Sequence, residues 1–505
     1  MLLRLSSAAT LSLLVSMSAG AAPPGAALTC ADVLKKIGKD LADVTCFEST
    51  DLTTTNPLTT PTNNSVAGLP AFAFTPQTDR GVIAPSAAKR PPITKVVPGV
   101  QINARIASDP TRQARFLLRL PNDWNGRLVV AGASGTRSEF NGDFAWSDYV
   151  VQKGYAYASQ NKGTLNFQFT TATDPLGCRL NPSSSLYVNF YDLAPGQEFT
   201  RWAEYMVKGG ELAQEGVKSA YGKPAKYTYA VGTSNGGYQV RRALELAPKV
   251  FDGGVDWEGT DVSEEAPNLL TDLPAAVLNW PDYSVTFDAN STAAKNIMAA
   301  GYPPDIVLPA IPTPPSGVTF SSRSFWGNYS NSYWEVTECQ WQKRLDPAYN
   351  TYVSGMGTYN YTQRRSFSDV GANMGDFATT GDVKQPLITV AGTMDGLLPI
   401  DHHARAYARK VEAARADANH GEASKDEKER PYRLYEVQNG NHIDTYQDGF
   451  PQLELIMPHA QKAFDLLVQQ VEDKVALPPS QCIPRGGAIA GAPAQSGHCA
   501  QPFVP

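Results

Sequence analysis

A serine in a glycine-rich turn is the residue of this sequence best suited to nucleophilic chemistry. Residues 232–237 read Gly-Thr-Ser-Asn-Gly-Gly, directly after a strand-like run at 227–231 and before a segment with helical periodicity. This strand–turn–helix context is typical of a nucleophile elbow, in which a side chain beside the serine would collide with the neighbouring strand and helix. The motif also occurs in ordinary turns and where serine caps a helix. The context favours Ser234 as a nucleophile.

Two later strand-like runs end in the other groups that such a serine needs. A serine hydroxyl requires a general base, and the base requires a carboxylate that orients it. Asp395 follows the apolar run at 386–394, and His442 follows the run at 432–437 within a Gly/Asn turn. Chain order and context therefore predict a triad of Ser234, Asp395 and His442.

Other residues remain open for the same roles. His403 is the main alternative base among only six histidines in the chain. Asp401 and Asp444 are alternative acids, although neither directly ends a strand-like run. Asp395 could instead cap a helix.

Backbone N–H groups are expected to stabilise a developing oxyanion. One is that of Asn235, immediately after the nucleophile. The other is expected from the small-residue turn after an early strand-like run, which holds Gly132, Ala133, Ser134 and Gly135. The sequence does not say which amide of that turn is used.

Strand-like runs alternate with helical segments on both sides of these residues. The strand-like runs are 126–132, 155–159, 227–231, 386–391 and 433–437, and helical spacing is seen at 199–221, 238–246, 402–416 and 453–471. This alternation predicts an α/β fold with a mostly parallel sheet flanked by helices.

Residues 262–380 interrupt the alternation and are rich in proline, asparagine, serine and aromatic residues. We expect a core domain made of residues 22–261 and 381–505, with 262–380 inserted as a lid domain. A stabilising insertion with its own aromatic core is the alternative. Trp326 and Trp334 of the insertion, with Trp257 at the end of a strand, are the expected walls of a substrate pocket.

Composition and the first residues indicate a compartment. The chain has 505 residues, 42% of them hydrophobic, and its net charge of -6 argues against nucleic-acid binding. Residues 1–21 resemble a signal peptide, with Arg4, a short apolar stretch and Ala-Gly-Ala at 19–21. No later stretch is apolar for long enough to span a membrane. We expect a secreted or periplasmic protein that does not bind membranes.

The cysteines are expected to form disulfides, because export leads to an oxidising compartment. All six lie after the expected cleavage site, and six cysteines permit about 15 connectivities. Local spacing suggests that neighbours pair at each end and that the remaining two pair across the middle. The suggested pairs are Cys30–Cys46, Cys482–Cys499 and Cys178–Cys339.

Metal or cofactor motifs are not apparent. The chain has no C-x-x-C pair, H-E-x-x-H, EF-hand loop, P-loop or G-x-G-x-x-G motif. We expect no cofactor and no catalytic metal. A structural Ca²⁺ near Asp282 and Asp288 is an alternative.

Two family resemblances extend this interpretation. Residues 120–127 (Leu-Pro-Asn-Asp-Trp-Asn-Gly-Arg), the G-x-S-x-G-G elbow and the long insertion before the acid resemble the tannase and feruloyl esterase family of α/β-hydrolases. That resemblance implies the α/β-hydrolase fold, a lid and cleavage of phenolic esters. The family usually has a disulfide between cysteines just before the serine and just after the histidine. Here Thr233 and Ile443 occupy those positions.

The C-terminal third is more similar to 3-hydroxybutyrate oligomer hydrolases. The similar stretches are 395–402 (Asp-Gly-Leu-Leu-Pro-Ile-Asp-His), 435–439 leading to His442, and 477–481, together with Ser-Asn-Gly-Gly at 234–237. This resemblance implies hydrolysis of hydroxyalkanoate oligoesters.

Together these features predict an exported serine carboxylic-ester hydrolase acting on hydroxyalkanoate oligoesters or related polyester fragments. A hydrolase of phenolic esters is the alternative, followed by a peptidase or acyltransferase with the same triad, and by a non-catalytic binding protein. The expected partner is a small or oligomeric ester, and the oligomeric state is left open.

Overall fold

The computed structural model describes most of the chain. The described residues are 27–35, 37, 39–63, 75–135, 137–164, 168–170, 178, 186–188, 198–314, 319–349, 359–418 and 427–505. The expected signal peptide at 1–21 lies outside them.

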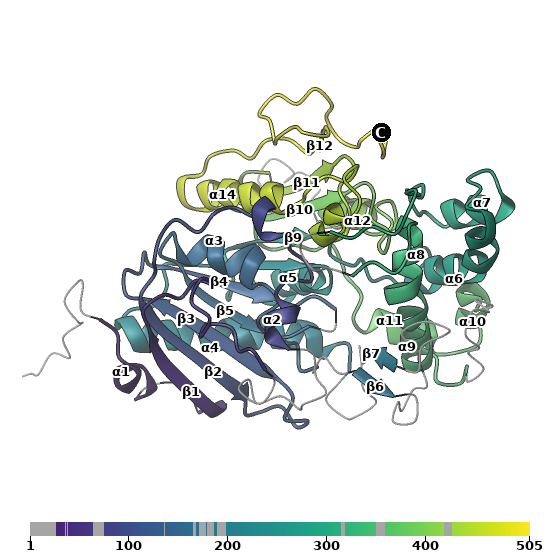
Figure 1. Ribbon diagram of the computed structural model, residues 1–505. Coiled ribbons are helices and arrows are strands. Elements are labelled where there is room, and N and C mark those ends of the chain that lie inside the picture. The colour runs from purple at the N-terminus through teal and green to yellow at the C-terminus, as the bar shows by residue number, and fades with distance from the viewer. Residues whose placement is uncertain are drawn as a thin grey trace, which may run out of the picture.

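A ten-stranded sheet crosses the molecule (Figure 1). From β5 onward in the sheet each neighbouring pair is parallel, whereas β1, β2, β3 and β5 pair antiparallel. The predicted mostly parallel sheet is therefore confirmed. In spatial order the strands are β1 (Leu41–Ser49), β2 (Gly99–Ile106), β3 (Arg115–Pro121), β5 (Ala156–Gln160), β4 (Arg127–Gly132), β8 (Tyr227–Thr233), β9 (Gly253–Trp257), β10 (Leu387–Gly392), β11 (Tyr432–Val437) and β12 (Gln481–Ile483).

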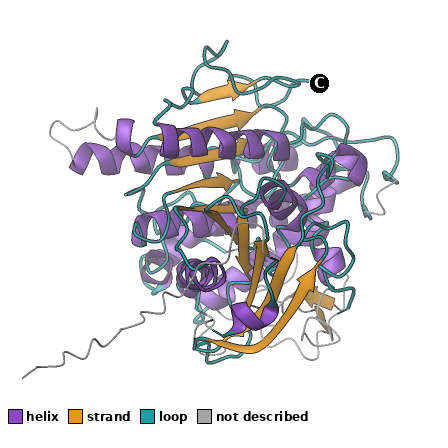
Figure 2. Cartoon of the chain, turned by 90° about the vertical axis from the view of Figure 1, so that its left-hand side faces the viewer, coloured by secondary structure: helices purple, strands orange, loops and turns teal. Residues whose placement is uncertain are grey.

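Helices cover both faces of the sheet (Figure 2). Along β4 the side chains alternate between two hydrophobic clusters, since Val129 joins one and Val130 the other. The first cluster includes residues of α3 (Asp148–Val151) and α14 (Met457–Asp473), and the second those of α4 (Arg201–Tyr221) and α12 (Ala404–Ala418). With α5 (Asn235–Leu246) after β8, this is the expected α/β-hydrolase fold.

The chain between β9 and β10 forms a helical insertion, seen to the right of the sheet in Figure 1. Its aromatic side chains are continuous with the main core: the Phe325 ring lies 5.8 Å from that of Tyr446, and Trp341 lies 5.4 Å from Phe199. The insertion thus packs directly on the sheet domain. Its elements are α6 (Leu269–Thr286), α7 (Thr292–Ala299), α8 (Phe325–Tyr329), η3 (Ser330–Trp334), α9 (Glu335–Leu345), α10 (Tyr361–Arg365) and α11 (Val370–Gly375).

Three disulfides join the cysteines in the pairs suggested by their spacing. Cys30–Cys46 links α1 (Cys30–Leu34) to β1. Cys178–Cys339 connects residue 178 to α9, and Cys482–Cys499 holds the C-terminal segment against β12. The elements β6 (Gln168–Thr170), β7 (Leu186–Val188), α2 (Pro76–Asp79), η1 (Ala87–Lys89), η2 (Asp143–Ser147) and η4 (Asp444–Asp448) complete the structure. Among the described helices, none is both long and apolar enough to cross a bilayer.

Candidate active site

Ser234 lies at the junction of β8 and α5 in a conformation that few residues adopt. Its φ is 60° and its ψ is −122°, and its N–H donates to the carbonyl of Trp257 (2.8 Å). Strain of this kind persists only where surrounding structure holds it. A Cβ at Gly232 would lie 2.3 Å from the carbonyl of Gly236, and one at Gly236 would lie 2.3 Å from that of Gly132. These glycines allow the close packing that presents Ser234.

The structure brings Ser234, His442 and Asp395 together as the sequence predicted. His442 Nε2 lies 2.8 Å from Ser234 Oγ, and His442 Nδ1 lies 2.7 Å from Asp395 Oδ2. The other carboxylate oxygen of Asp395 accepts the N–H groups of Leu397 and Leu398, each at 2.7 Å. Asp395 follows β10 and His442 follows β11, so adjacent parallel strands place the two side chains side by side.

The alternative acids and base have other roles. His403 Nδ1 accepts the N–H of Asp261 (3.1 Å). Asp444 accepts the N–H groups of Ile456 and Met457 at the start of α14. Asp401 forms an ion pair with Arg405 (3.0 Å).

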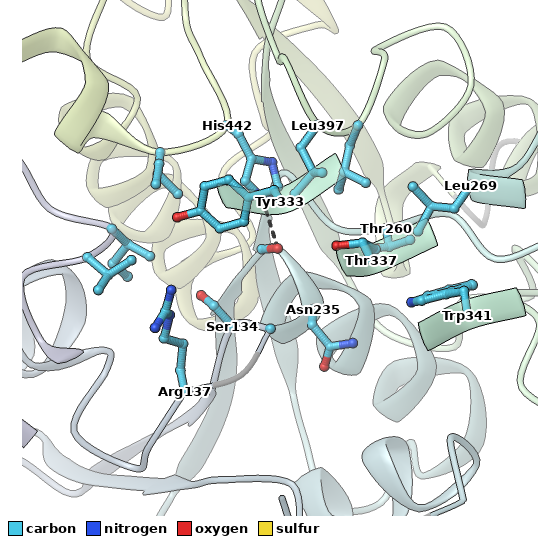
Figure 3. A pocket seen from close by; sticks show the side chains of 16 residues that line it. Ser134, Arg137, Asn235, Thr260, Leu269, Tyr333, Thr337, Trp341, Leu397 and His442 are labelled. Carbon is cyan, nitrogen blue, oxygen red and sulfur yellow. Dashed lines mark hydrogen bonds between the residues drawn. The ribbon is translucent and has the colours of Figure 1, made fainter. Parts of the chain in front are cut away.

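A cavity opens directly above Ser234 (Figure 3). Its apolar walls come from the main domain and from the insertion, which contributes the two aromatic rings of Tyr333 and Trp341. The lining residues are Val82, Ile83, Ser134, Gly135, Arg137, Ser234, Asn235, Thr260, Leu269, Tyr333, Thr337, Trp341, Leu397, Leu398, His442 and Ile443.

The prediction that Trp257, Trp326 and Trp334 line the pocket is wrong, because all three side chains belong to the hydrophobic core. Trp326 Nε1 donates to the carbonyl of Pro303 (3.0 Å), and Trp334 Nε1 donates to that of Gly396 (2.7 Å). Large aromatic side chains bury the most apolar area and so concentrate in cores.

Two of the expected oxyanion residues border the cavity and two do not. Asn235 and Ser134 line it, together with Gly135. Gly132 ends β4 and packs against Gly236, while the carbonyl of Ala133 accepts Gln239 Nε2 (2.9 Å). Gly132 and Ala133 are thus not among the lining residues and pack against the elbow, and their role in binding the oxyanion stays a prediction.

The loop that carries Ser134 and Gly135 is fixed by a buried lysine. Lys162 Nζ donates to the carbonyl of Ser134 (2.5 Å) and to that of Gly135. Burial lowers the pKa of Lys162 to about 7, while Asp79 acts in the opposite direction. Asp79 in turn accepts the N–H and hydroxyl of Ser138, both at 2.6 Å.

A second buried acid touches the triad. Glu258 follows β9, is 2% exposed and accepts the N–H of Gly392. Burial raises the pKa of Glu258 well above its usual range, and the adjacent Asp395, to which it hydrogen-bonds, raises it further. The protonated Glu258 can donate this hydrogen bond to the Asp395 carboxylate.

Sequence reasoning missed Glu258, Lys162, Asp79 and Arg137. Glu258 directly follows a strand, the same signal that identified Asp395. The other three come from separate segments, Asp79 from the end of α2 and Lys162 and Arg137 from loops, and share no motif, so no sequence signal marks them.

In the described part of the chain, no group of three or more His, Cys, Asp or Glu side chains is arranged so that it could hold a metal ion. Of the two residues considered for Ca²⁺, Asp282 lies on α6 and Asp288 accepts the N–H of Asn290 (2.9 Å).

The C-terminal part of the chain is similar in sequence to a known protein family. Residues 354–504 match the model of the 3HB-oligomer hydrolase (3HBOH) family. A D-(-)-3-hydroxybutyrate oligomer hydrolase of Burkholderia thailandensis is 32% identical over 142 residues, which are 27% of this chain and 19% of that protein. The chain thus matches about a fifth of the length of such relatives.

Solved structures of similar layout include feruloyl esterase B from Aspergillus oryzae and tannin acyl hydrolase from Aspergillus niger. The first has a TM-score of 0.48 at 14% identity, covering 88% of this chain and 90% of that one. The second has a TM-score of 0.48 at 12% identity, covering 89% and 88%. The family match over residues 354–504 includes Asp395 and His442, whereas Ser234 lies outside it. Over that segment the predicted resemblance to 3-hydroxybutyrate oligomer hydrolases is confirmed.

Proposed function

We propose that this protein is a serine carboxylic-ester hydrolase that cleaves hydroxyalkanoate oligoesters. The observation that carries the proposal is the hydrogen-bonded chain from Ser234 Oγ through His442 to Asp395, with distances of 2.8 and 2.7 Å, beneath a cavity. The family match of the segment that carries Asp395 and His442 supports the substrate class.

The reaction proceeds through an acyl-enzyme. His442 Nε2 removes the Ser234 proton as Oγ attacks the ester carbonyl, and Asp395 stabilises the resulting imidazolium. The backbone N–H of Asn235 and one from the Ser134–Gly135 turn face the oxyanion. The carbon–oxygen bond to the alcohol then breaks, and His442 protonates the leaving alkoxide. Water, activated by the same histidine, releases the acid and restores Ser234.

Ser234→Ala tests the mechanism. We expect hydrolysis of p-nitrophenyl butyrate and of the 3-hydroxybutyrate dimer to fall by about 10⁴-fold or more. Ser219→Ala on α4 is the matched control and should retain wild-type rates. Unchanged turnover in Ser234→Ala would overturn the proposal.

A phenolic ester is the second candidate substrate, because the rings of Tyr333 and Trp341 line the cavity. A panel of 3-hydroxybutyrate dimer and trimer, methyl ferulate and methyl gallate separates the two. Higher kcat/KM for the hydroxybutyrate oligomers supports the first candidate. If the phenolic esters are preferred and Trp341→Ala reverses the preference, the second is correct.

We further propose that the insertion at 262–380 acts as a lid. Its support is that Leu269, Tyr333, Thr337 and Trp341 all line the cavity. Tyr333→Ala is expected to change KM for the dimer more than kcat. An unchanged KM would contradict a role in substrate binding.

Export is proposed from residues 1–21 and fits the three disulfides. N-terminal sequencing of the mature protein is expected to begin at Ala22. Mass spectrometry without reduction should find no free thiol, and six free thiols would contradict export.

A further inference from the structure

Arg137 brings a positive charge to the cavity that the triad does not use. It lines the same cavity as Ser234 and His442, with 14% of its side chain exposed. In Figure 3 its guanidinium group is directed toward the space that Ser134 and Tyr333 also border. The group is thus presented to whatever ester occupies Ser234.

The surroundings of Arg137 suit an anionic group joined to a short aliphatic chain. None of the described residues that line the cavity is an aspartate or a glutamate. Val82, Ile83 and Ile443 supply apolar surface in the same lining. A ligand carboxylate would therefore meet a cation without facing an anion in the wall.

A buried carboxylate behind the wall orients the guanidinium. Asp79 Oδ1 lies 3.5 Å from Arg137 Nη1, and Asp79 is only 1% exposed. Lys162 lies near the same carboxylate, and burial lowers the pKa of this lysine to about 7. Burial raises the pKa of Asp79. Burial also raises the pKa of the nearby Glu139 to about 7. Arg137 is thus a cation of the cavity wall itself, whereas Asp79 is not among the residues that line the cavity. A guanidinium held in this way can form two parallel hydrogen bonds with a carboxylate.

We propose that Arg137 binds a free carboxylate on the leaving part of the ester. The preferred substrate is then a short ester of a hydroxy acid, cleaved at the bond next to its carboxylate end. In a 3-hydroxy acid the carboxylate carbon lies three bonds from the ester oxygen, and Ser234 and Arg137 line the same cavity. This inference rests on the proposed function and narrows its substrate class.

The chemistry of the cleavage is unchanged by this contact. The bond from Ser234 Oγ to the carbonyl carbon forms, the bond from that carbon to the ester oxygen breaks, and the leaving hydroxy acid takes its proton from His442. Arg137 transfers no proton and acts as a specificity-determining residue. Binding energy gained at Arg137 aligns the ester with Ser234.

The test compares three esters with wild-type enzyme and with Arg137→Gln. The substrates are the 3-hydroxybutyrate dimer with its free carboxylate, the same dimer capped as a carboxamide, and p-nitrophenyl butyrate. For Arg137→Gln we expect kcat/KM on the free dimer to fall by about 10- to 100-fold, the range for losing a hydrogen bond between charged groups. Rates on the two uncharged esters should stay within about threefold of wild type.

Two further variants make the result specific. Arg137→Lys keeps the charge but loses the planar fork, so it should recover part of the activity on the free dimer. Arg409→Gln on the exposed side of α12 removes the same charge elsewhere and should behave as wild type.

The outcomes separate this inference from the proposed function. Equal losses of Arg137→Gln on all three esters, or a wild-type enzyme that does not prefer the free carboxylate over the carboxamide, would overturn the inference. Absence of hydrolysis of every ester by the wild-type enzyme would instead overturn the proposed function.

Discussion

Two walls of the cavity are held in place by different physical means. The strand-end wall, formed by Ser234, Asp395 and His442, is fixed by backbone groups: Asp395 Oδ1 accepts two N–H groups, and Gly232 and Gly236 pack in direct contact. The loop wall, formed by Ser134, Gly135 and Arg137, is fixed by the buried ionisable side chains of Lys162 and Asp79. The strand-end wall is thus held by backbone donors and glycine packing, whereas the loop wall depends on two buried ionisable side chains.

This difference assigns separate tasks to the two walls. In the proposed mechanism the strand-end wall holds the groups that transfer protons, and such groups tolerate little displacement. The loop wall brings Arg137 and the Ser134–Gly135 turn to the cavity, where we propose that they bind the substrate. We therefore expect that mutating a charged residue of the loop wall changes substrate preference while the geometry of the triad stays the same. Glu258 is a further ionisable group of the strand-end region, beside Asp395.

Asp395→Asn is expected to have the largest effect among variants that keep the overall geometry. The amide favours the wrong tautomer of His442, and kcat on p-nitrophenyl butyrate should fall by about 10⁴-fold. Asp401→Asn, which removes an exposed carboxylate six residues away, should retain activity. A loss of less than tenfold in Asp395→Asn would show that another group orients His442.

Lys162→Met tests the loop wall directly. Without its hydrogen bonds to the carbonyls of Ser134 and Gly135, the turn should lose the alignment of its oxyanion donor. We expect kcat to fall by about 100-fold, comparable to removing one donor, with a smaller change in KM. Lys462→Met on the exposed side of α14 is the control. If kcat of Lys162→Met is unchanged, the lysine does not position the loop.

Variants of Glu258 test whether an uncharged hydrogen-bond donor beside Asp395 is sufficient for activity. Glu258→Gln keeps a side-chain donor toward Asp395 and an acceptor for the N–H of Gly392, so activity should stay within about threefold of wild type. Glu258→Ala removes both and should lower kcat by about tenfold. An equal loss in both variants would show that the carboxyl group itself is required. The pH profile of kcat separates this result from a merely structural effect.

The same contrast explains what the sequence could predict. Ser234, Asp395 and His442 each follow a strand, and parallel strands bring their carboxyl ends to one edge, so chain order alone located them. Arg137, Lys162 and Asp79 come from segments far apart in the sequence and meet only when these segments pack, which leaves no local signal. The antiparallel strands β1–β3 were not predicted either. Arg119 of β3 is fully buried, where it pairs with Asp143 (2.6 Å), so its polar character gave no indication of a core strand.

The smallest expected effect on activity concerns Glu338, which lies on α9 between the cavity-lining Thr337 and the disulfide-bonded Cys339. Burial raises the pKa of Glu338 to about 8. The negative charge of Glu335 also raises this pKa, whereas the hydrogen bond from Gln342 lowers it. Between the usual pKa of 4.5 and about 8, the folded protein keeps a proton that the unfolded chain has released. Folding stability therefore declines as pH rises through this window, and the stabilising contribution is lost by about pH 8.

Glu338→Gln removes that decline because the amide stays neutral. We expect its free energy of unfolding to equal that of wild type near pH 4.5 and to exceed it at pH 8 by an amount on the order of a few kcal/mol. Urea unfolding at both pH values measures the difference, with Glu412→Gln on the exposed side of α12 as control. Since Glu338 does not line the cavity, kcat at pH 6 should not change. A parallel pH dependence of the two proteins would show that Glu338 is already ionised in the folded state. A loss of kcat would show instead that α9 transmits its packing to the lining residues Thr337 and Trp341.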